Sequence, residues 1–266
     1  MTDWGVQPDW RHPGLQAYAA WGEAVQDHLA LGLSMAQAMN RLTASLSHES
    51  ALAHPGLPRF IPGDALPPDL PYEVFIHQQR AVPTRDNWHD GFNALCWLRL
   101  PVLKWHFNRL QAEVISREGI RAQRGPVRDA ITVFDENGLL LQAPDALWQA
   151  IAQRQWQRAF VDLRSAWAQC RWVIVGHALL DHLRRPFKGI TAHVLRWPTD
   201  WGTEETTLAH GMASQLSAEV LARKPFTPLP VMGMPGWMLG QDEADFFADH
   251  TVFRPARRDP GLTQGA

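Results

Sequence analysis

The chain of 266 residues carries 25 lysines and arginines against 27 aspartates and glutamates, which gives a formal net charge of −2. Because this balance is nearly neutral and no long block of one sign appears, broad electrostatic attraction to nucleic acid or to an anionic membrane surface is not expected. The length allows one large domain or two small ones, and this composition points to a small molecule or another protein as the partner.

Two helices are predicted near the N-terminus. Apolar residues recur at helical spacing over residues 15–33, where Gly32 suits the helix end, and a second helix should run from Ser34, a favourable N-cap, to about Leu46. Six prolines then fall within residues 54–71. Such a density of prolines predicts an extended connection rather than a helix.

A helix predicted over residues 86–101 carries the first functional signal, and a short helix over residues 72–79 precedes it. The longer helix is apolar nearly all round, which is typical of a buried helix. Its polar residues His89, Asp90 and Asn93 share about 100° of the circumference at 3.6 residues per turn. An unpaired buried donor or acceptor costs roughly 1 to 3 kcal/mol, so these side chains require partners. We therefore expect this helix to form the wall of a site.

The next predicted helix ends at Gly119, a favourable C-cap. Lys104, Asn108 and Gln111 form a polar stripe along this helix. One interpretation is a solvated helix face. The other is that the two helices form an antiparallel pair, in which Lys104 and Asn108 meet the His89 cluster.

Residues 126–143 leave two structures open. Apolar alternation around an Asn-Gly pair favours a β-hairpin with a tight turn. A short helix that begins at the proline of this segment, followed by one strand, fits as well. The neighbours Arg128 and Asp129 precede the buried part of the segment. They form either a simple ion pair or an extension of the site to which Asp129 contributes a carboxylate.

Two helices over residues 144–156 and 157–163 are predicted next, followed by a buried helix over residues 172–183. The buried helix contains His177 and Asp181, which are four residues apart and therefore share one face. In such a pair the carboxylate can fix the tautomer of the histidine, or both side chains can bind a metal ion.

The last third of the chain is predicted to contain a strand or helix start over residues 188–197, which includes His193, and a helix over residues 207–222. The segment after that is rich in proline and glycine, and its aromatic residues predict that it packs back on the body of the protein. Neither an internal repeat nor a glycine- and serine-rich linker appears. We expect one globular domain over residues 1–258 and a disordered tail over residues 259–266.

Cys96 and Cys170 lie in apolar stretches without a paired spacing motif, which suits buried free thiols in a reducing compartment, although a disulfide between them stays open. The N-terminus lacks the basic start and apolar segment of a signal peptide, and no apolar run approaches about 18 residues. These features predict a cytoplasmic protein without a membrane partner. Most of the 13 tryptophans recur among apolar residues, so we expect them to fill the core.

The sequence has neither a glycine-rich nucleotide motif, a serine-nucleophile elbow, a His-Glu-x-x-His motif nor a Cys-x-x-Cys pair. What remains is a set of His, Asp and Asn residues in apolar segments. These residue types suit a divalent metal ion whose bound water is activated by a carboxylate base. The candidate metal ligands are His89, Asn93, His177 and His193. The candidate catalytic residues are the carboxylates Asp90 and Asp129 and, as binders of an anionic group, Arg85 and Lys104.

Five segments join these candidates to their surroundings over most of residues 60–255. In order, they read VPTRDNWHDGFNALCWLRLPVLKWHFN, RDAITVFDENG, GHALLDHLRRPFKGITAH, PLPVMGMPGW and VFRP. Together they resemble an uncharacterised bacterial family, the domain of unknown function DUF3025. The resemblance implies a shared fold, leaves a shared site open and brings no activity with it.

The sequence thus predicts a mainly helical single domain with a small β-hairpin and an irregular C-terminal segment. The first functional hypothesis is a metal-dependent enzyme, most simply a hydrolase, that acts on a small anionic substrate. The alternative from another class is a non-catalytic binding or interaction protein in which the buried polar cluster only fixes helix packing. An enzyme without metal, with histidine and aspartate in acid–base roles, is the third possibility.

Overall fold

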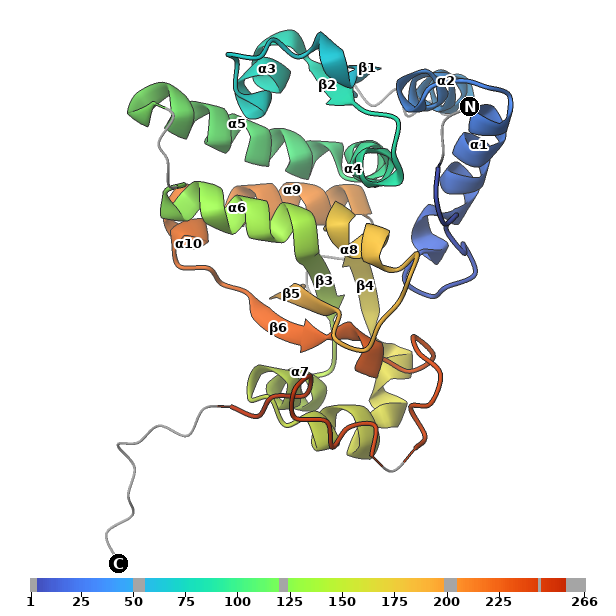
Figure 1. Ribbon diagram of the computed structural model, residues 1–266. Coiled ribbons are helices and arrows are strands. Elements are labelled where there is room, and N and C mark those ends of the chain that lie inside the picture. Colours follow the sequence, from blue (N-terminus) through green and yellow to red (C-terminus); the bar gives the residue numbers. More distant parts are fainter. Residues whose placement is uncertain (1–3, 50–55, 120–123, 199–204, 244, 257–266) are drawn as a thin grey trace, which may run out of the picture.

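The computed structural model describes residues 4–49, 56–119, 124–198, 205–243 and 245–256. Helices predominate in these parts of the chain, and strands form a two-stranded and a four-stranded sheet. Most helices occupy the upper part of the molecule in Figure 1, and the four-stranded sheet crosses the middle. The expectation of a mainly helical fold holds at this level. The predicted tail over residues 259–266 lies outside the described residues.

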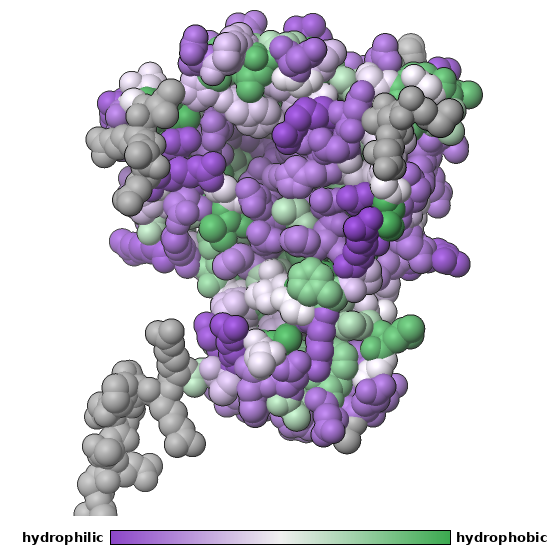
Figure 2. All heavy atoms as spheres, in the orientation of Figure 1, coloured by the Kyte–Doolittle hydropathy of each residue, from purple (hydrophilic) through white to green (hydrophobic). Residues whose placement is uncertain are grey.

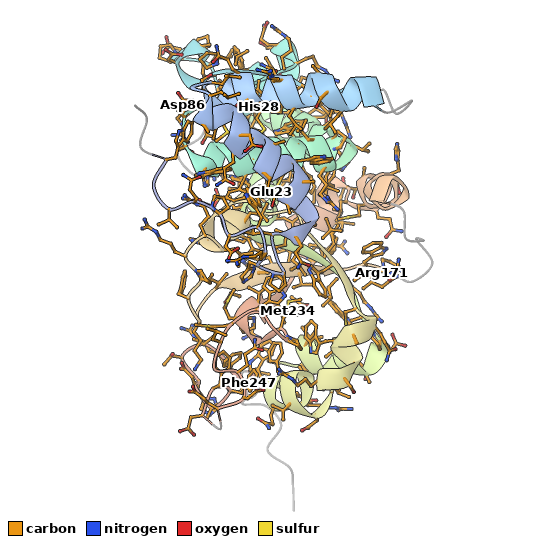
Figure 3. The ribbon with its side chains drawn as sticks, turned by 90° about the vertical axis from the view of Figure 1, so that its right-hand side faces the viewer. Glu23, His28, Asp86, Arg171, Met234 and Phe247 are labelled. Atoms are coloured by element: carbon orange, nitrogen blue, oxygen red, sulfur yellow. The ribbon has the colours of Figure 1, made fainter. Side chains whose placement is uncertain are left out.

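The two N-terminal helices are confirmed as α1 (Ala19–Ala30) and α2 (Met35–Glu49). The Ser34 hydroxyl accepts a hydrogen bond from the backbone N–H of Gln37 at 3.3 Å, as expected of an N-cap. The Asp86 carboxylate also accepts from the backbone N–H of Met35 at 2.7 Å, and Figure 3 shows Asp86 beside this end of α2. The polar group of a distant segment therefore helps to fix the start of α2.

The proline-rich connection is extended, as predicted, and contains β1 (Arg59–Pro62). This strand pairs in parallel with β2 (Ala81–Thr84), and α3 (Tyr72–Gln79) lies between them in the chain. A parallel pair requires such a crossover, since a tight turn joins only antiparallel strands. The predicted helix over residues 72–79 matches α3.

The central pair of helices is α4 (Trp88–Arg99) and α5 (Pro101–Glu118). Both agree with the prediction, and Gly119 donates its backbone N–H to Ile115 at the end of α5. Figure 1 shows α4 end on and α5 lengthwise, so the two helices cross steeply and the expected antiparallel pairing is wrong. At Gly91, a Cβ would lie 2.7 Å from the terminal carbon of Met35, so glycine allows α2 to pack closely on α4.

Residues 126–143 form α6 (Pro126–Asn137) and then β3 (Gly138–Gln142), so the predicted β-hairpin is wrong and the helix followed by one strand is right. The Asn-Gly pair ends a helix instead of turning between two strands. β3 lies inside a mixed sheet of order β4-β3-β5-β6, antiparallel to β4 and parallel to β5. The other strands of this sheet are β4 (Arg171–Ile174), β5 (Thr191–Arg196) and β6 (Thr227–Pro230).

The buried helix predicted over residues 172–183 is wrong in its first half, which belongs to β4, and right in its second half, which is α8 (His177–His182). A short continuous apolar run with β-branched residues fits a buried strand as well as a buried helix, so periodicity did not separate the two. The strand alternative for residues 188–197 is confirmed by β5. The helix predicted over residues 207–222 is divided into α9 (Glu205–Gln215) and α10 (Ala218–Ala222).

The sheet is buried on both faces. Leu139 and Leu141 of β3 belong to one apolar cluster, whereas Leu140 between them belongs to a second cluster with α5, α6, α9 and α10. Successive side chains of a strand point to opposite faces, so β3 contributes to both clusters. β4, which begins at the labelled Arg171, is seen from the side in Figure 3.

The lower end of the molecule consists of α7 (Asp145–Ala152), a π-helical turn (Arg158–Asp162), a 3₁₀ turn (Arg164–Gln169) and the C-terminal segment. Trp237, Phe246 and Phe253 of that segment are buried, which confirms that it packs back on the body. Met234 and Phe247 mark this packing in Figure 3. Further 3₁₀ turns are formed by Gln16–Tyr18, Gly63–Ala65 and Val231–Gly233.

The cysteines and most of the tryptophans were expected to lie in the core. Cys96 and Cys170 are free thiols, and Cys96 is buried. Trp10, Trp88, Trp97, Trp156, Trp167, Trp197 and Trp237 are buried, as expected of core tryptophans. No helix within the described ranges combines the length and the apolar character needed to cross a membrane.

Candidate functional site

A pocket of about 420 Å³ lies between α3, α4 and α5 on one side and α6 and α8 on the other. In Figure 2, hydrophilic residues dominate the face that covers these helices. Of the predicted site residues, the pocket is lined by Arg85, His89, Asp90, Asn93 and His177. The other polar lining residues are Tyr72, Glu73, Gln111, Arg124, Thr132, Asp135 and Glu136.

The N-terminus of α4 orients one arginine at this pocket. Asn87 caps the helix by accepting a hydrogen bond from the backbone N–H of Asp90 at 2.8 Å. The Asp90 carboxylate accepts from Arg85 through its backbone N–H at 2.8 Å, its Nε at 3.1 Å and its Nη2 at 2.9 Å. Both carboxylate oxygens are therefore occupied. Asp90 holds the guanidinium of Arg85, whose side chain is 69% exposed, and is poorly placed to act as a base.

His89 faces a carboxylate of α8. Its Nδ1 lies 3.7 Å from Oδ2 of Asp181, and Arg184 donates to Oδ1 of the same carboxylate at 2.7 Å. The neighbouring Asp181 carboxylate raises the pKa of His89, and partial burial opposes this effect. The predicted interaction within α8 between His177 and Asp181 is replaced by this contact between helices. Because Asp181 faces Nδ1, Nε2 of His89 is left for a ligand.

His177 is buried and has the opposite pKa shift. Its Nδ1 lies 2.7 Å from the backbone carbonyl of Asp135, and only a protonated Nδ1 can donate to that oxygen. Burial lowers the pKa of His177 to about 4, so the ring is neutral at pH 7 and its Nε2 carries a lone pair. The Asp135 carboxylate lies 3.7 Å from the same Nδ1, but a neutral ring makes this contact a polar neighbour and not an ion pair.

The two histidine rings meet edge to face. Their centroids are 4.6 Å apart and their planes are inclined by 72°. Because Asp181 and the Asp135 carbonyl engage the two Nδ1 atoms, the Nε2 atoms of His89 and His177 are the ones left for chemistry. The pocket therefore contains two adjacent imidazoles whose pKa values are shifted in opposite directions.

A buried lysine binds the carboxylate that lies beside His177. Nζ of Lys104, a residue only 4% exposed, donates to Oδ1 of Asp135 at 2.5 Å and to Oδ1 of Asn93 at 2.9 Å. Asn93 in turn donates to the hydroxyl of Tyr72 at 3.0 Å. Burial is the largest single effect on the pKa of Asp135 and raises it, but the charge and hydrogen bond of Lys104, together with the two histidines, lower that pKa overall. These distances support the hypothesis that Lys104 meets the polar residues of α4. The side-chain amide of Asn93 is occupied by its bonds with Lys104 and Tyr72.

A close backbone approach brings α8 to the end of α6. A Cβ at Gly176 would lie 2.4 Å from the carbonyl oxygen of Glu136 and 2.5 Å from the backbone nitrogen of Gly138. Only glycine permits that spacing. The next residue, His177, is consequently held beside Asp135.

Sequence reasoning did not select Asp135 or Glu136 as site residues. With Thr132 they lie on one face of α6, at i, i+3 and i+4, and all three line the pocket. The helix alternative for this segment would have revealed that face, whereas the hairpin alternative concealed it. Tyr72 and Glu73 were missed because α3 is a short helix without a polar stripe.

Two predicted residues lie elsewhere. Oδ2 of Asp129 is 2.5 Å from Nζ of Lys224, and the Asp129 side chain is 43% exposed. His193 belongs to β5 and packs against the ring of Phe226, where burial lowers its pKa. Neither residue is part of the pocket lining, and the structure does not bring them to His89.

The four residues predicted to bind a metal ion do not come together in one cluster. Of the four predicted ligands, His89 and His177 adjoin, Asn93 is hydrogen-bonded to Lys104 and Tyr72, and His193 does not line the pocket. In the part of the chain that the structure describes, no group of three or more His, Cys, Asp or Glu side chains could hold a metal ion. The side chains present therefore do not fit the predicted metal centre.

Comparison with known proteins places the chain in a family. A family profile with the description "Protein of unknown function (DUF3025)" matches residues 58–257, and the chain belongs to this family. Neither a curated protein nor a solved structure gives a significant match. All residues that line the pocket lie within the matched region.

Proposed function

We propose that this member of the DUF3025 family is an enzyme, most simply a hydrolase, that acts on a small anionic substrate by acid–base catalysis. The observation that carries the proposal is the pair of adjacent histidines, His89 and His177, whose pKa values are shifted in opposite directions. Titratable neighbours whose environments separate their pKa values are typical of an acid and a base. A metal ion is not needed for this chemistry.

In the proposed reaction, a water molecule attacks the electrophilic centre of the substrate and gives a proton to Nε2 of His177. The bond to the leaving group breaks, and the leaving group takes a proton from Nε2 of His89. The proton then returns from His177 to His89, which restores both rings. An anionic substrate beside His177 raises its pKa, because negative charge favours the imidazolium, and so makes it a stronger base.

The charges of the lining favour an anion. Three of the four lining carboxylates have cationic partners: Asp90 is bound by Arg85, Asp135 by Lys104, and Glu73 faces Arg128 at 3.5 Å. Arg85 and the exposed Arg124 remain available at the pocket. A guanidinium that is held at one edge by a carboxylate keeps donors for a second acid group.

The test is hydrolysis of the phosphate and acetate esters of 4-nitrophenol by the wild type, His89→Gln, His177→Gln and the control His77→Gln. His77 is an exposed histidine of α3 that does not line the pocket. We expect either site substitution to lower turnover by roughly 100- to 10,000-fold, and the control to leave it unchanged. A chelator should have no effect.

Turnover that survives both site substitutions would refute the proposal. Turnover that a chelator abolishes and a divalent metal ion restores would replace it with the metal-dependent hydrolase. If neither ester is turned over and no small anion raises the thermal midpoint, the interaction protein becomes the better description.

A further inference from the structure

A small inner chamber of about 40 Å³ adjoins the pocket on the side of α5. Tyr72, Glu73, Asn93, Gln111 and Asp135 line both spaces. Water occupies roughly 30 Å³ in the liquid, so the chamber has room for about one non-hydrogen atom with its hydrogens. A ligand in the pocket could therefore insert a single small group.

Two residues that line this chamber, Asn108 and Gln111, carry a buried acceptor without a partner among the described residues. Oδ1 of Asn108 and Oε1 of Gln111 are both shielded from solvent and, among the described residues, neither accepts a hydrogen bond. The residues are only 5% and 8% exposed. Asn108 donates its Nδ2 to the backbone carbonyl of Glu73 at 2.8 Å, which fixes the orientation of its amide. Since an unpaired buried acceptor costs roughly 1 to 3 kcal/mol, the chamber calls for a hydrogen-bond donor.

The charge of the chamber decides what kind of donor fits. Lys104 lines it and places a buried ammonium group there. The two carboxylates of the lining already have cationic partners, since Asp135 is bound by Lys104 and Glu73 faces Arg128. A second cation would therefore be repelled by the ammonium without gaining a free carboxylate. A hydroxyl group is neutral, donates to one amide oxygen and can accept from Lys104, whose ammonium has three hydrogens and two bonds in the chain, to Asp135 and Asn93.

We infer that the inner chamber binds a hydroxyl group of the substrate, so that the substrate class is a small hydroxylated acid. Its acid group lies at Arg85 and Arg124, and its hydroxyl group lies between Asn108 and Gln111. This inference rests on the proposed function, because it assumes that the pocket takes an anion. It adds the requirement for a hydroxyl group on that anion.

The experiment compares matched probes by isothermal titration and thermal shift. The pairs are glycolate with acetate, glycerate with propionate, and glycerol 3-phosphate with propyl phosphate. We expect the wild type to bind the hydroxylated member of at least one pair about tenfold more tightly, which corresponds to about 1.4 kcal/mol. A site with buried hydrogen-bonding groups discriminates against an analogue that leaves them unpaired.

Substitutions of Gln111 test whether the chamber causes this preference for the hydroxylated probe. Gln111→Met keeps the length of the side chain and removes the acceptor, so the preference should disappear. Gln111→Glu retains acceptor oxygens and should keep it, which preserves a test if the methionine variant does not fold. The control is Gln79→Met, at an exposed position outside both spaces.

The outcomes separate the inference from the proposed function. If both members of every pair bind equally while Arg85→Ala abolishes binding, the chamber does not bind a substrate hydroxyl and the inference fails, whereas the anion pocket stands. If the preference persists in Gln111→Met, the hydroxyl group binds elsewhere and the inference also fails. If no probe of either kind binds, the proposed function fails and the inference fails with it.

Discussion

The pocket differs from the aromatic cluster at the lower end of the molecule, which consists of Phe160, Trp167, Phe247 and Phe253. In the lower cluster, the ring of Phe160 stacks on Trp167 at 5.6 Å and on Phe247 at 5.5 Å. Around the pocket, the buried Lys104 forms an ion pair with the partly buried Asp135, and the amide oxygens of Asn108 and Gln111 lack partners among the described residues. Apolar burial stabilises a fold with few further requirements, whereas buried charge has a desolvation cost that stability alone does not explain. The contrast supports the proposal that the polar side chains of the pocket serve binding or catalysis rather than stability.

The largest expected effect lies in the aromatic cluster. Phe160→Ala removes a fully buried ring with aromatic neighbours and should lower the free energy of unfolding by about 3 to 5 kcal/mol. Chemical denaturation measures this loss. At a temperature where the variant is folded, anion binding at the pocket should match the wild type. Phe187→Ala is the control, because that ring is 51% exposed and its removal should change stability by about 0.5 kcal/mol at most.

At the ion pair between Lys104 and the partly buried Asp135, stability and function should separate. Lys104→Met leaves the Asp135 carboxylate without its cation and should destabilise the protein by about 3 kcal/mol. The double variant Lys104→Met/Asp135→Leu replaces both charges by apolar groups and should recover most of that loss, yet it should lose anion binding and turnover. The wild type, the two single variants Lys104→Met and Asp135→Leu, and the double variant form a double-mutant cycle. Their stability is measured by urea denaturation and their anion binding by titration calorimetry. Equal stability of all four would mean that the pair is not buried in solution.

The two regions also differed in how far the sequence predicted them. Long periodic segments identified α4 and α5, and the aromatic C-terminal segment was expected to pack on the body. The wall of the site was recognised because His89 and Asn93 interrupt an apolar helix. These signals are local, so a single sequence contains them.

The opposite wall required information about distant contacts. Whether residues 126–143 form a hairpin or a helix depends on the partners of β3, which come from β4 and β5. Asp135 faces His177 because Gly176 approaches the backbone of Glu136, a contact across about 40 residues of chain that periodicity does not report. The same limitation paired Asp181 with the wrong histidine.

The pH dependence of stability sharpens the difference between the two histidines. The folded pKa of His177 is about 4, below the ordinary value of 6.5, so the unfolded chain binds more protons between these values and stability falls as the pH is lowered from 6.5 to 4. His89 has the opposite sign: its raised pKa stabilises the fold below 6.5, and that contribution is lost as the pH rises through the folded value.

His177→Gln should therefore remove most of the acid-side loss. Between pH 7 and pH 4.5, the wild type should lose about 2 kcal/mol more than this variant, measured by denaturation at each pH. His77→Gln should behave like the wild type. Identical pH profiles of His177→Gln and the wild type would contradict a buried neutral histidine at this position.

The smallest effect concerns Asp90, which the sequence predicts as a catalytic carboxylate and which the structure places against Arg85. If Asp90 positions Arg85, as their three hydrogen bonds indicate, Asp90→Asn should cost about 1 kcal/mol of stability. It should weaken anion binding and leave the pH dependence of turnover unchanged. If Asp90 were the catalytic base, the same variant would remove the acid limb of the pH–rate profile while anion affinity stayed the same. Arg85→Lys completes the comparison, because it retains the charge but loses the bidentate geometry, and it should weaken anion binding as Asp90→Asn does.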